Sequence, residues 1–203
     1  MRQYLKLFAW MIPSMLLLPL LGCIVEDKIV DFVINEETCG EFVERHVSAN
    51  YTNSTIIDYA KEIDEALEDN DLSRSQIQTA RIVSGNYTVT AFSHEHDWVI
   101  GGAILVSRDD ALDGPDTLME YSGISLRNEL GVENAMPLHP DGVALLHRAI
   151  DDYLAGLRPR LVFTVQSASV TPEPSPSDSL KFDWEACLLS HVVVVDTLEV
   201  LDP

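Results

Sequence analysis

Stretches rich in β-branched and aromatic residues recur along this chain, and they constrain its fold more than any other feature. Seven stretches have the composition and length of strands: residues 28–34, 42–49, 78–92, 98–107, 118–121, 160–170 and 182–200. The stretch EETCG at 36–40 predicts a turn after the first strand. The polar tip at 93–97 predicts that residues 78–92 and 98–107 form a hairpin, and Gly101-Gly102 predicts a packing or bulge site within it.

Two other segments have the period of an amphipathic helix. In residues 54–69 the apolar side chains recur at spacings of four, three and four, which places them on one helical face. Ser54 or Thr55 can cap this helix, Asp58 favours the same end, and Asn70 suits its exit. A second helix is expected to begin near Pro140 and to end at Gly156.

The order of these segments indicates the fold class. Strands outnumber helices by about seven to two and do not alternate regularly with them, which argues against a parallel α/β sheet. The sequence therefore predicts a mainly β fold, an antiparallel β-sandwich or flattened barrel of about seven strands with two amphipathic helices. An α+β arrangement is the alternative. The chain has 203 residues, 46% of them apolar, so we expect residues 28–203 to form a single β-rich domain with a real core.

The amino terminus has the layout of a secretory signal. Arg2 and Lys6 give it a basic start, and an almost continuous apolar run follows at residues 7–21. Pro13 and Pro19 interrupt this run, which is also shorter than the roughly 20 apolar residues of a bilayer-spanning helix. We therefore expect export and not a permanent membrane span.

Leu20-Leu21-Gly22-Cys23 comes at the end of this run and resembles the lipobox of bacterial lipoproteins. The resemblance covers the signal and the cysteine only. It implies that residues 1–22 are cleaved, that Cys23 is lipidated and that residues 23–27 form a short tether. Because Ile24 and not aspartate follows the cysteine, the sorting rule of that family implies the outer membrane rather than the inner. An incidental thiol beside an ordinary cleavage site is the alternative.

Two cysteines remain, Cys39 and Cys187. In an oxidising compartment such a pair usually forms a disulfide. The 147 residues between them make a long loop, whose closure could stabilise the fold by up to about 5 kcal/mol in the chain-entropy model. Two separate buried thiols are the alternative.

The charge of the chain excludes one class of partner. The formal charge is −20, and without residues 1–22 it is −22, with 11 basic and 33 acidic residues. A nucleic-acid-binding protein needs a basic patch, and none is present in the sequence. The expected partners are the membrane, through the lipid on Cys23, and another envelope or surface protein.

Two clusters have the composition of metal sites. His94, His96 and Asp97 could bind zinc, because two imidazoles and a carboxylate leave one coordination position open. A polar tip that serves solubility has the same composition.

The second cluster resembles part of a calcium loop. Asp109, Asp113 and Glu120 match positions one, five and twelve of the EF-hand spacing, with Gly114 at position six. Ala111 stands at position three, where a ligand is missing. In so acidic a chain a chance match is the alternative.

The sequence has no Gly-x-Ser-x-Gly elbow and no phosphate-binding glycine loop. It therefore favours a lipid-anchored envelope protein with a non-catalytic binding or structural domain. A metal-dependent module, either zinc hydrolase-like or calcium-binding, is the alternative.

Overall fold

The computed structural model describes residues 25–110, 115–175 and 178–201. These residues fall into two compact units. The described residues of the smaller unit, 25–32 and 195–201, are extended strand. The larger unit, Val33–Val194, contains the described helices and the remaining strand residues.

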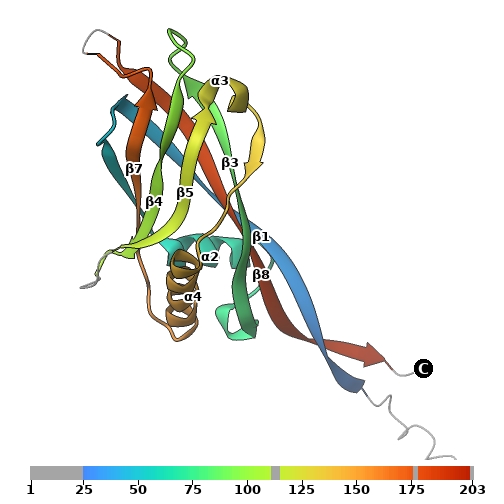
Figure 1. Ribbon diagram of the computed structural model, residues 1–203. Helices are drawn as coiled ribbons and strands as arrows, with labels where there is room; N and C mark the ends of the chain where they lie inside the picture. Colours follow the sequence, from blue (N-terminus) through green and yellow to red (C-terminus); the bar gives the residue numbers. More distant parts are fainter. Residues whose placement is uncertain (1–24, 111–114, 176–177, 202–203) are drawn as a thin grey trace, which may run out of the picture. The chain divides into compact units, whose positions relative to one another are not determined.

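Two four-stranded antiparallel sheets form a sandwich with unclosed sheets, which confirms the predicted fold class (Figure 1). Sheet A has the order β1-β8-β3-β6 and sheet B the order β2-β7-β4-β5. The strands of sheet A are β1 (Val25–Val47), β8 (Leu180–Leu201), β3 (Ile77–Phe92) and β6 (Glu133–Ala135). Those of sheet B are β2 (Thr52–Ile57), β7 (Leu161–Thr171), β4 (Val99–Arg108) and β5 (Asp116–Ser125).

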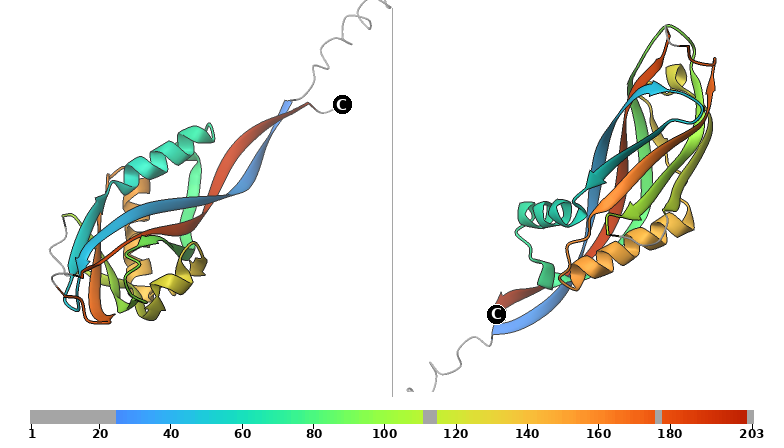
Figure 2. Two further views of the ribbon diagram at one scale, coloured as in Figure 1. Left: turned by 90° about the horizontal axis from the view of Figure 1, so that it is seen from above. Right: turned by 90° about the vertical axis from the view of Figure 1, so that its left-hand side faces the viewer.

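The described helices are α2 (Tyr59–Asp69), α3 (Leu126–Glu129) and α4 (Pro140–Leu154), with a 3-10 turn at Arg74–Gln76. In both side and front views α2 and α4 lie at one end of the sheets and α3 lies near the other (Figures 1 and 2). None of the helices in the described ranges is both long and apolar enough to cross a bilayer.

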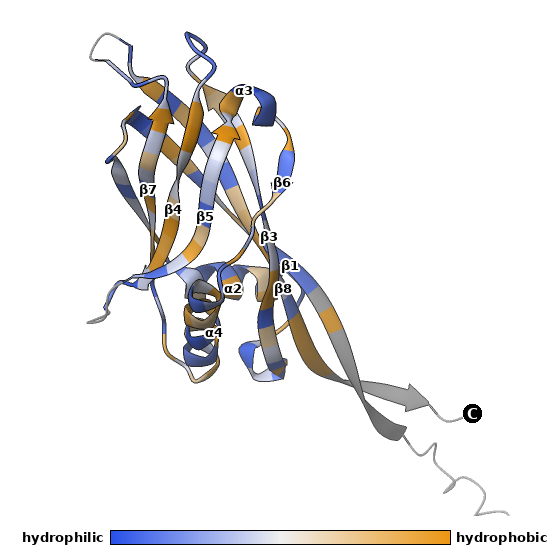
Figure 3. Ribbon diagram, viewed as in Figure 1, coloured by the Kyte–Doolittle hydropathy of each residue, from blue (hydrophilic) through white to orange (hydrophobic). Residues whose placement is uncertain are grey.

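The core lies between the sheets and beneath the helices. Apolar and hydrophilic residues are interspersed along the strands and along α4 (Figure 3). Trp98, Leu126, Leu146, Leu161 and Leu180 are completely buried. Burying each such side chain stabilises the fold by about 1.5–3 kcal/mol before the opposing loss of conformational entropy.

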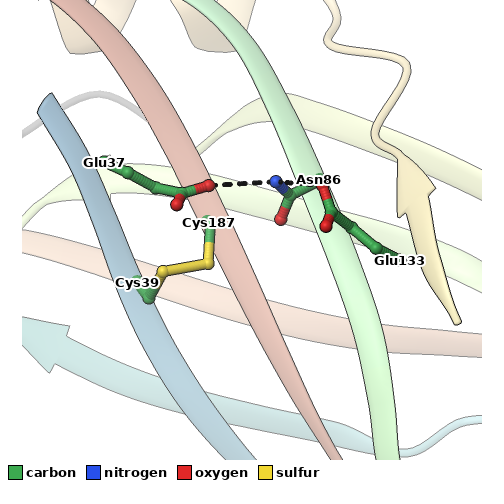
Figure 4. The surroundings of a disulfide bond; sticks show 5 residues. All are labelled: Glu37, Cys39, Asn86, Glu133 and Cys187. Carbon is green, nitrogen blue, oxygen red and sulfur yellow. Dashed lines mark hydrogen bonds between the residues drawn. A yellow bond between two sulfur atoms is a disulfide. The ribbon is translucent and has the colours of Figure 1, made fainter. Parts of the chain in front are cut away.

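One predicted turn is wrong. Residues 36–40 continue β1 as a strand, in which Glu37 and Cys39 are exposed and Thr38 is half-buried. Glu37 and Cys39 belong to the outward side of an edge strand, where charge discourages pairing with other chains. Cys39 is joined there to Cys187 of the adjacent β8, with their Cα atoms 4.0 Å apart, so the expected disulfide is present (Figure 4).

The predicted start of the first helix is also wrong. Residues 52–57 form β2, which pairs with β7 from Thr52↔Gln166 to Ile57↔Leu161, and α2 begins only at Tyr59. Asp58 caps this helix by accepting a hydrogen bond from the Lys61 N–H at 3.1 Å. The second helix is confirmed, with Pro140 in its first turn.

The predicted hairpin consists of real strands that do not pair. β3 pairs with β8 and β6, whereas β4 pairs with β5 and β7, so the connection at 93–98 crosses from one sheet to the other. The completely buried Trp98 stabilises this crossing, because its indole N–H donates to the Ser93 carbonyl at 3.0 Å.

The segment after α3 and the helix α4 close one side of the sandwich. β6 pairs with β3 of sheet A, and three residues later Leu138 forms a bridge with Met119 of sheet B. His147 of α4 accepts the backbone N–H of Ile82 at 3.1 Å. A Cβ at Gly142 would lie 2.6 Å from the Leu118 Cα, so α4 rests directly on β5.

A charged network joins α2, α4 and the 3-10 turn. The Asp64 carboxylate accepts hydrogen bonds from the Tyr153 hydroxyl at 2.6 Å, Arg158 at 2.9 Å and Arg74 at 3.3 Å. The Arg74 guanidinium also stacks on the Tyr153 ring, 4.1 Å from its centroid. The Tyr153 hydrogen bond is the main cause that lowers the pKa of Asp64, and the two arginines add to it.

We expect Asp64→Asn to destabilise the fold in a pH-dependent manner. A lowered carboxyl pKa stabilises the folded state above the ordinary value of 3.8, and the effect is lost as the pH falls through the lowered pKa. After allowance for solvent screening, the loss at neutral pH should be at most about 1 kcal/mol. Urea unfolding from neutral to acid pH measures it, with the exposed Glu68→Gln as the control. A difference that stays constant down to the lowest pH would contradict the assignment.

Candidate functional site

The outer face of sheet B is almost uncharged. Pairing across the four strands aligns its outward side chains in rows. The rows are Glu120-Ala103-Gln166-Thr52, Thr117-Leu105-Thr164-Ser54 and Ser107-Val162-Ile56. Glu120 is the only ionisable side chain in these rows, although the chain as a whole has 33 acidic residues. This face therefore differs in charge from the average surface of the protein.

Two glycines shape the α3 end of this face. The register of β4 shifts at Gly101-Gly102 against both of its neighbours, which confirms the predicted bulge. A Cβ at Gly102 would lie 1.9 Å from the Gln166 carbonyl oxygen, so a side chain has no room there. The Tyr121 ring packs against Gly102, and its hydroxyl donates to that same carbonyl at 3.2 Å. Burial raises the pKa of Tyr121, which therefore stays protonated at neutral pH.

An open hollow of about 780 Å³ lies at this bulge, and we call it the sheet B hollow. Its volume is in the range of small-molecule sites, roughly 300–1,000 Å³. Its walls consist mainly of small and polar residues. They are Asn50, Gly101, Gly102, Ala103, Glu120, Tyr121, Ser122, Gln166, Ser167, Ala168 and Ser169.

Ser167 has a hydroxyl group without a partner. The residue is only 7% exposed, and its Oγ is buried with no hydrogen-bonding group in reach among the described residues. A buried hydroxyl that makes no hydrogen bond costs about 1–3 kcal/mol. Ser167 alternates with the outward-facing Gln166 and shares the buried side of β7 with Val165, so its hydroxyl faces the interior and not the hollow.

A buried carboxyl group lies behind this region. Glu44 of β1 is completely buried and accepts hydrogen bonds from Asn53 at 3.1 Å and Trp184 at 3.4 Å. Among the described residues no cationic group lies within 4 Å of this carboxylate. Burial, and secondly the hydrogen bond with Glu44, raise the pKa of Tyr51 to about 12. Because the Tyr51 carbonyl accepts the Ser167 N–H at 2.9 Å, this cluster positions one wall of the hollow.

The sequence did not indicate that Glu44 is buried, and the backbone shows why. The alternation pattern places Glu44 and His46 on one side of a half-exposed strand. His46 instead has a φ of 58°, which breaks the alternation. Phe42 and Glu44 point inward before it, and Val47 is buried after it.

The zinc candidates lie in the connection between β3 and β4, each with a partner of its own. His96 pairs with Asp178, Asp97 pairs with Arg127, and the His94 ring packs edge-on against Phe92. Within the described ranges, the single group of three ligand atoms lying within 4.8 Å of one another is Glu37, Cys39 and Cys187. The sulfurs of that group are already joined as the disulfide, and Asn86 donates a hydrogen bond to Glu37 beside it (Figure 4).

The calcium candidates are dispersed as well. Asp109 pairs with Arg160 at 2.9 Å, at the end of β4 that lies away from the hollow. Glu120 pairs with Ala103 of β4, and Ala103 precedes Asp109 by six residues in the sequence. A metal ion that bound Asp97 or Asp109 would have to displace the arginine paired with that carboxylate. Asp113 and the lipidation candidate Cys23 lie outside the described residues.

Comparison with known proteins adds no assignment. No protein-family description matches the chain, and no curated protein is significantly similar to it. The candidate site therefore rests on its own geometry.

We expect Ser167→Ala to raise the free energy of unfolding by about 1 kcal/mol, because it removes a buried hydroxyl that has no partner. Ser190→Ala is the matched control. Ser190 is also buried, at 8% exposed, but its hydroxyl bonds with Tyr59, so its loss should lower stability by about 1 kcal/mol. Urea unfolding of the two variants measures the contrast. Equal destabilisation would show that Ser167 has a partner in the folded protein.

Proposed function

We propose that this chain is an exported, lipid-anchored protein of the bacterial cell envelope that acts by binding through the sheet B hollow. The anchoring part rests on the signal-like start, the apolar run and the Leu20-Leu21-Gly22-Cys23 sequence. Since Ile24 follows the cysteine, the outer membrane is the preferred location.

One observation carries the binding part of the proposal. The hollow combines a lining whose one charged residue is Glu120, a glycine floor fixed by close approach, and the exposed polar side chains of Gln166 and Ser169.

The same lining argues for binding and against catalysis. It contains no histidine, lysine, arginine or cysteine, and the Tyr121 hydroxyl already donates a hydrogen bond. Apart from the Glu120 carboxylate, the lining therefore has no group that could act as a base toward its serines. A partner that binds to these groups would be held and not converted.

The anchoring proposal predicts the behaviour of Cys23→Ser. The variant should lose all incorporation of a labelled fatty acid, and the protein should appear in the soluble fraction instead of the membrane fraction. Metabolic labelling followed by fractionation measures both effects. Cys39→Ser with Cys187→Ser is the control, because it removes the other two cysteines without touching the lipobox. Continued labelling of Cys23→Ser would refute the assignment.

The binding proposal predicts protection of the hollow in the envelope. A cysteine introduced as Ser169→Cys should react with a maleimide more slowly in isolated envelopes than in purified protein, because the bound partner covers it. Ser75→Cys, at an exposed residue outside the hollow, should react equally in both. Equal rates for Ser169→Cys in the two preparations would refute occupancy of the hollow.

A further inference from the structure

The charge of the hollow restricts the class of ligand. Glu120 is the one carboxylate in the lining, and no lysine or arginine belongs to it. Outside the hollow, arginines form ion pairs with aspartates, as in Arg45–Asp183, Arg81–Asp151 and Arg160–Asp109. A phosphate, sulfate or carboxylate ligand would therefore find no counter-charge in a chain of net charge −20. The ligand must be neutral or nearly so.

The side chains of the hollow also disfavour an apolar ligand. Large exposed apolar residues occur in the described structure, for example Val33, Ile56 and Leu157, but none of them lines the hollow. The apolar part of the lining is limited to alanines, glycines and the packed Tyr121 ring. A lipid tail would bury little apolar area here, and burial is its source of affinity.

A peptide strand is disfavoured for a different reason. Addition of a strand requires a free sheet edge. The floor of the hollow belongs to β4, which is an inner strand with β5 on one side and β7 on the other. Recognition must therefore use side-chain groups that point out of the sheet.

Those side-chain groups are hydroxyls, amides and one carboxylate. Asn50 and Gln166 each offer donors and an acceptor, Ser122 and Ser169 are exposed hydroxyls, and Glu120 accepts only. We propose that the sheet B hollow binds a neutral carbohydrate, an inference that rests on the proposed binding function. Each sugar hydroxyl both donates and accepts a hydrogen bond, so a saccharide matches this mixture without any charge.

The experiment uses the full, lipid-anchored chain in detergent with three neutral probes: maltohexaose, cellohexaose and chitohexaose. Hydrogen–deuterium exchange with millimolar probe should show protection of peptides that contain Gly101–Ala103 and Ser167–Ser169. A sulfated heparin hexasaccharide should give none. Ser169→Trp fills the hollow and Gln166→Ala removes an exposed amide, so each should weaken binding by at least about tenfold. Ser75→Trp is the control, and circular dichroism verifies that each variant is folded.

The outcomes separate the two proposals. Absence of protection with all three neutral probes, or protection by the heparin fragment alone, would overturn the carbohydrate assignment. The assignment would also be overturned if Gln166→Ala and Ser169→Trp, tested separately, both bound the probes as well as the unaltered protein does. If Ser169→Cys is still protected in envelopes, the hollow binds another class of partner and the proposed function stands. If it reacts equally in both preparations, the proposed function fails as well.

Discussion

The pairing of β8 with its two neighbours is the constraint on which the rest of the structure depends. This last strand lies between β1, the first strand, and β3, and its register with β3 runs from Phe92↔Phe182 to Ile77↔Val194. Such contacts join residues about 100 positions apart, so the entropy of closing a long loop must be overcome before sheet A can form. The Cys39–Cys187 disulfide adds a covalent bond between β8 and its other neighbour, β1. Once β8 is in place, Phe182, Trp184 and Leu188 supply the buried face against which sheet B packs.

The local pattern of the sequence predicted the elements better than their pairing. Strand composition, the helix at 140–154 and the cysteine pair depend on nearby residues or on simple chemistry, and all three are confirmed. The pairing of 78–92 with 98–107 was wrong because a short polar connection can join two strands in one sheet or in two. The structure places β3 and β4 in different sheets, with Trp98 completely buried at the crossing, and alternation does not encode this. Similarly, Ile56 fitted a helical face by its spacing, yet it lies on β2 and is 50% exposed.

The candidate site was harder to predict, since chemistry-bearing residue types directed the prediction to the metal candidates and not to the hollow. Histidines and aspartates are visible in a sequence, but the arginines that neutralise Asp97 and Asp109 are 30 and 51 positions further along the chain. The hollow is lined mainly by Gly, Ser and Ala, with Asn50, Glu120, Tyr121 and Gln166, and these residues form no motif in the sequence. Gly101-Gly102 was the available signal, and it indicated a bulge without indicating what the bulge exposes. The role of Glu44 depends on the left-handed backbone of His46, which a non-glycine residue rarely adopts.

Charge distribution links the hollow to the expected setting of the protein. Beside an anionic envelope surface, a domain of strong negative charge is repelled over roughly the Debye length, about 8–10 Å at physiological ionic strength. Repulsion of this kind keeps the acidic faces apart from the membrane and from other acidic molecules. The rows of sheet B are the exception, because Glu120 is their only charge and it lies on the edge strand β5. A neutral partner that approaches this face meets little repulsion and finds hydrogen-bonding groups already fixed by the sheet. Specificity then comes from the geometry of those groups, which the close approach of Gly102 to Gln166 and the hydrogen bonds of Glu44 hold in place.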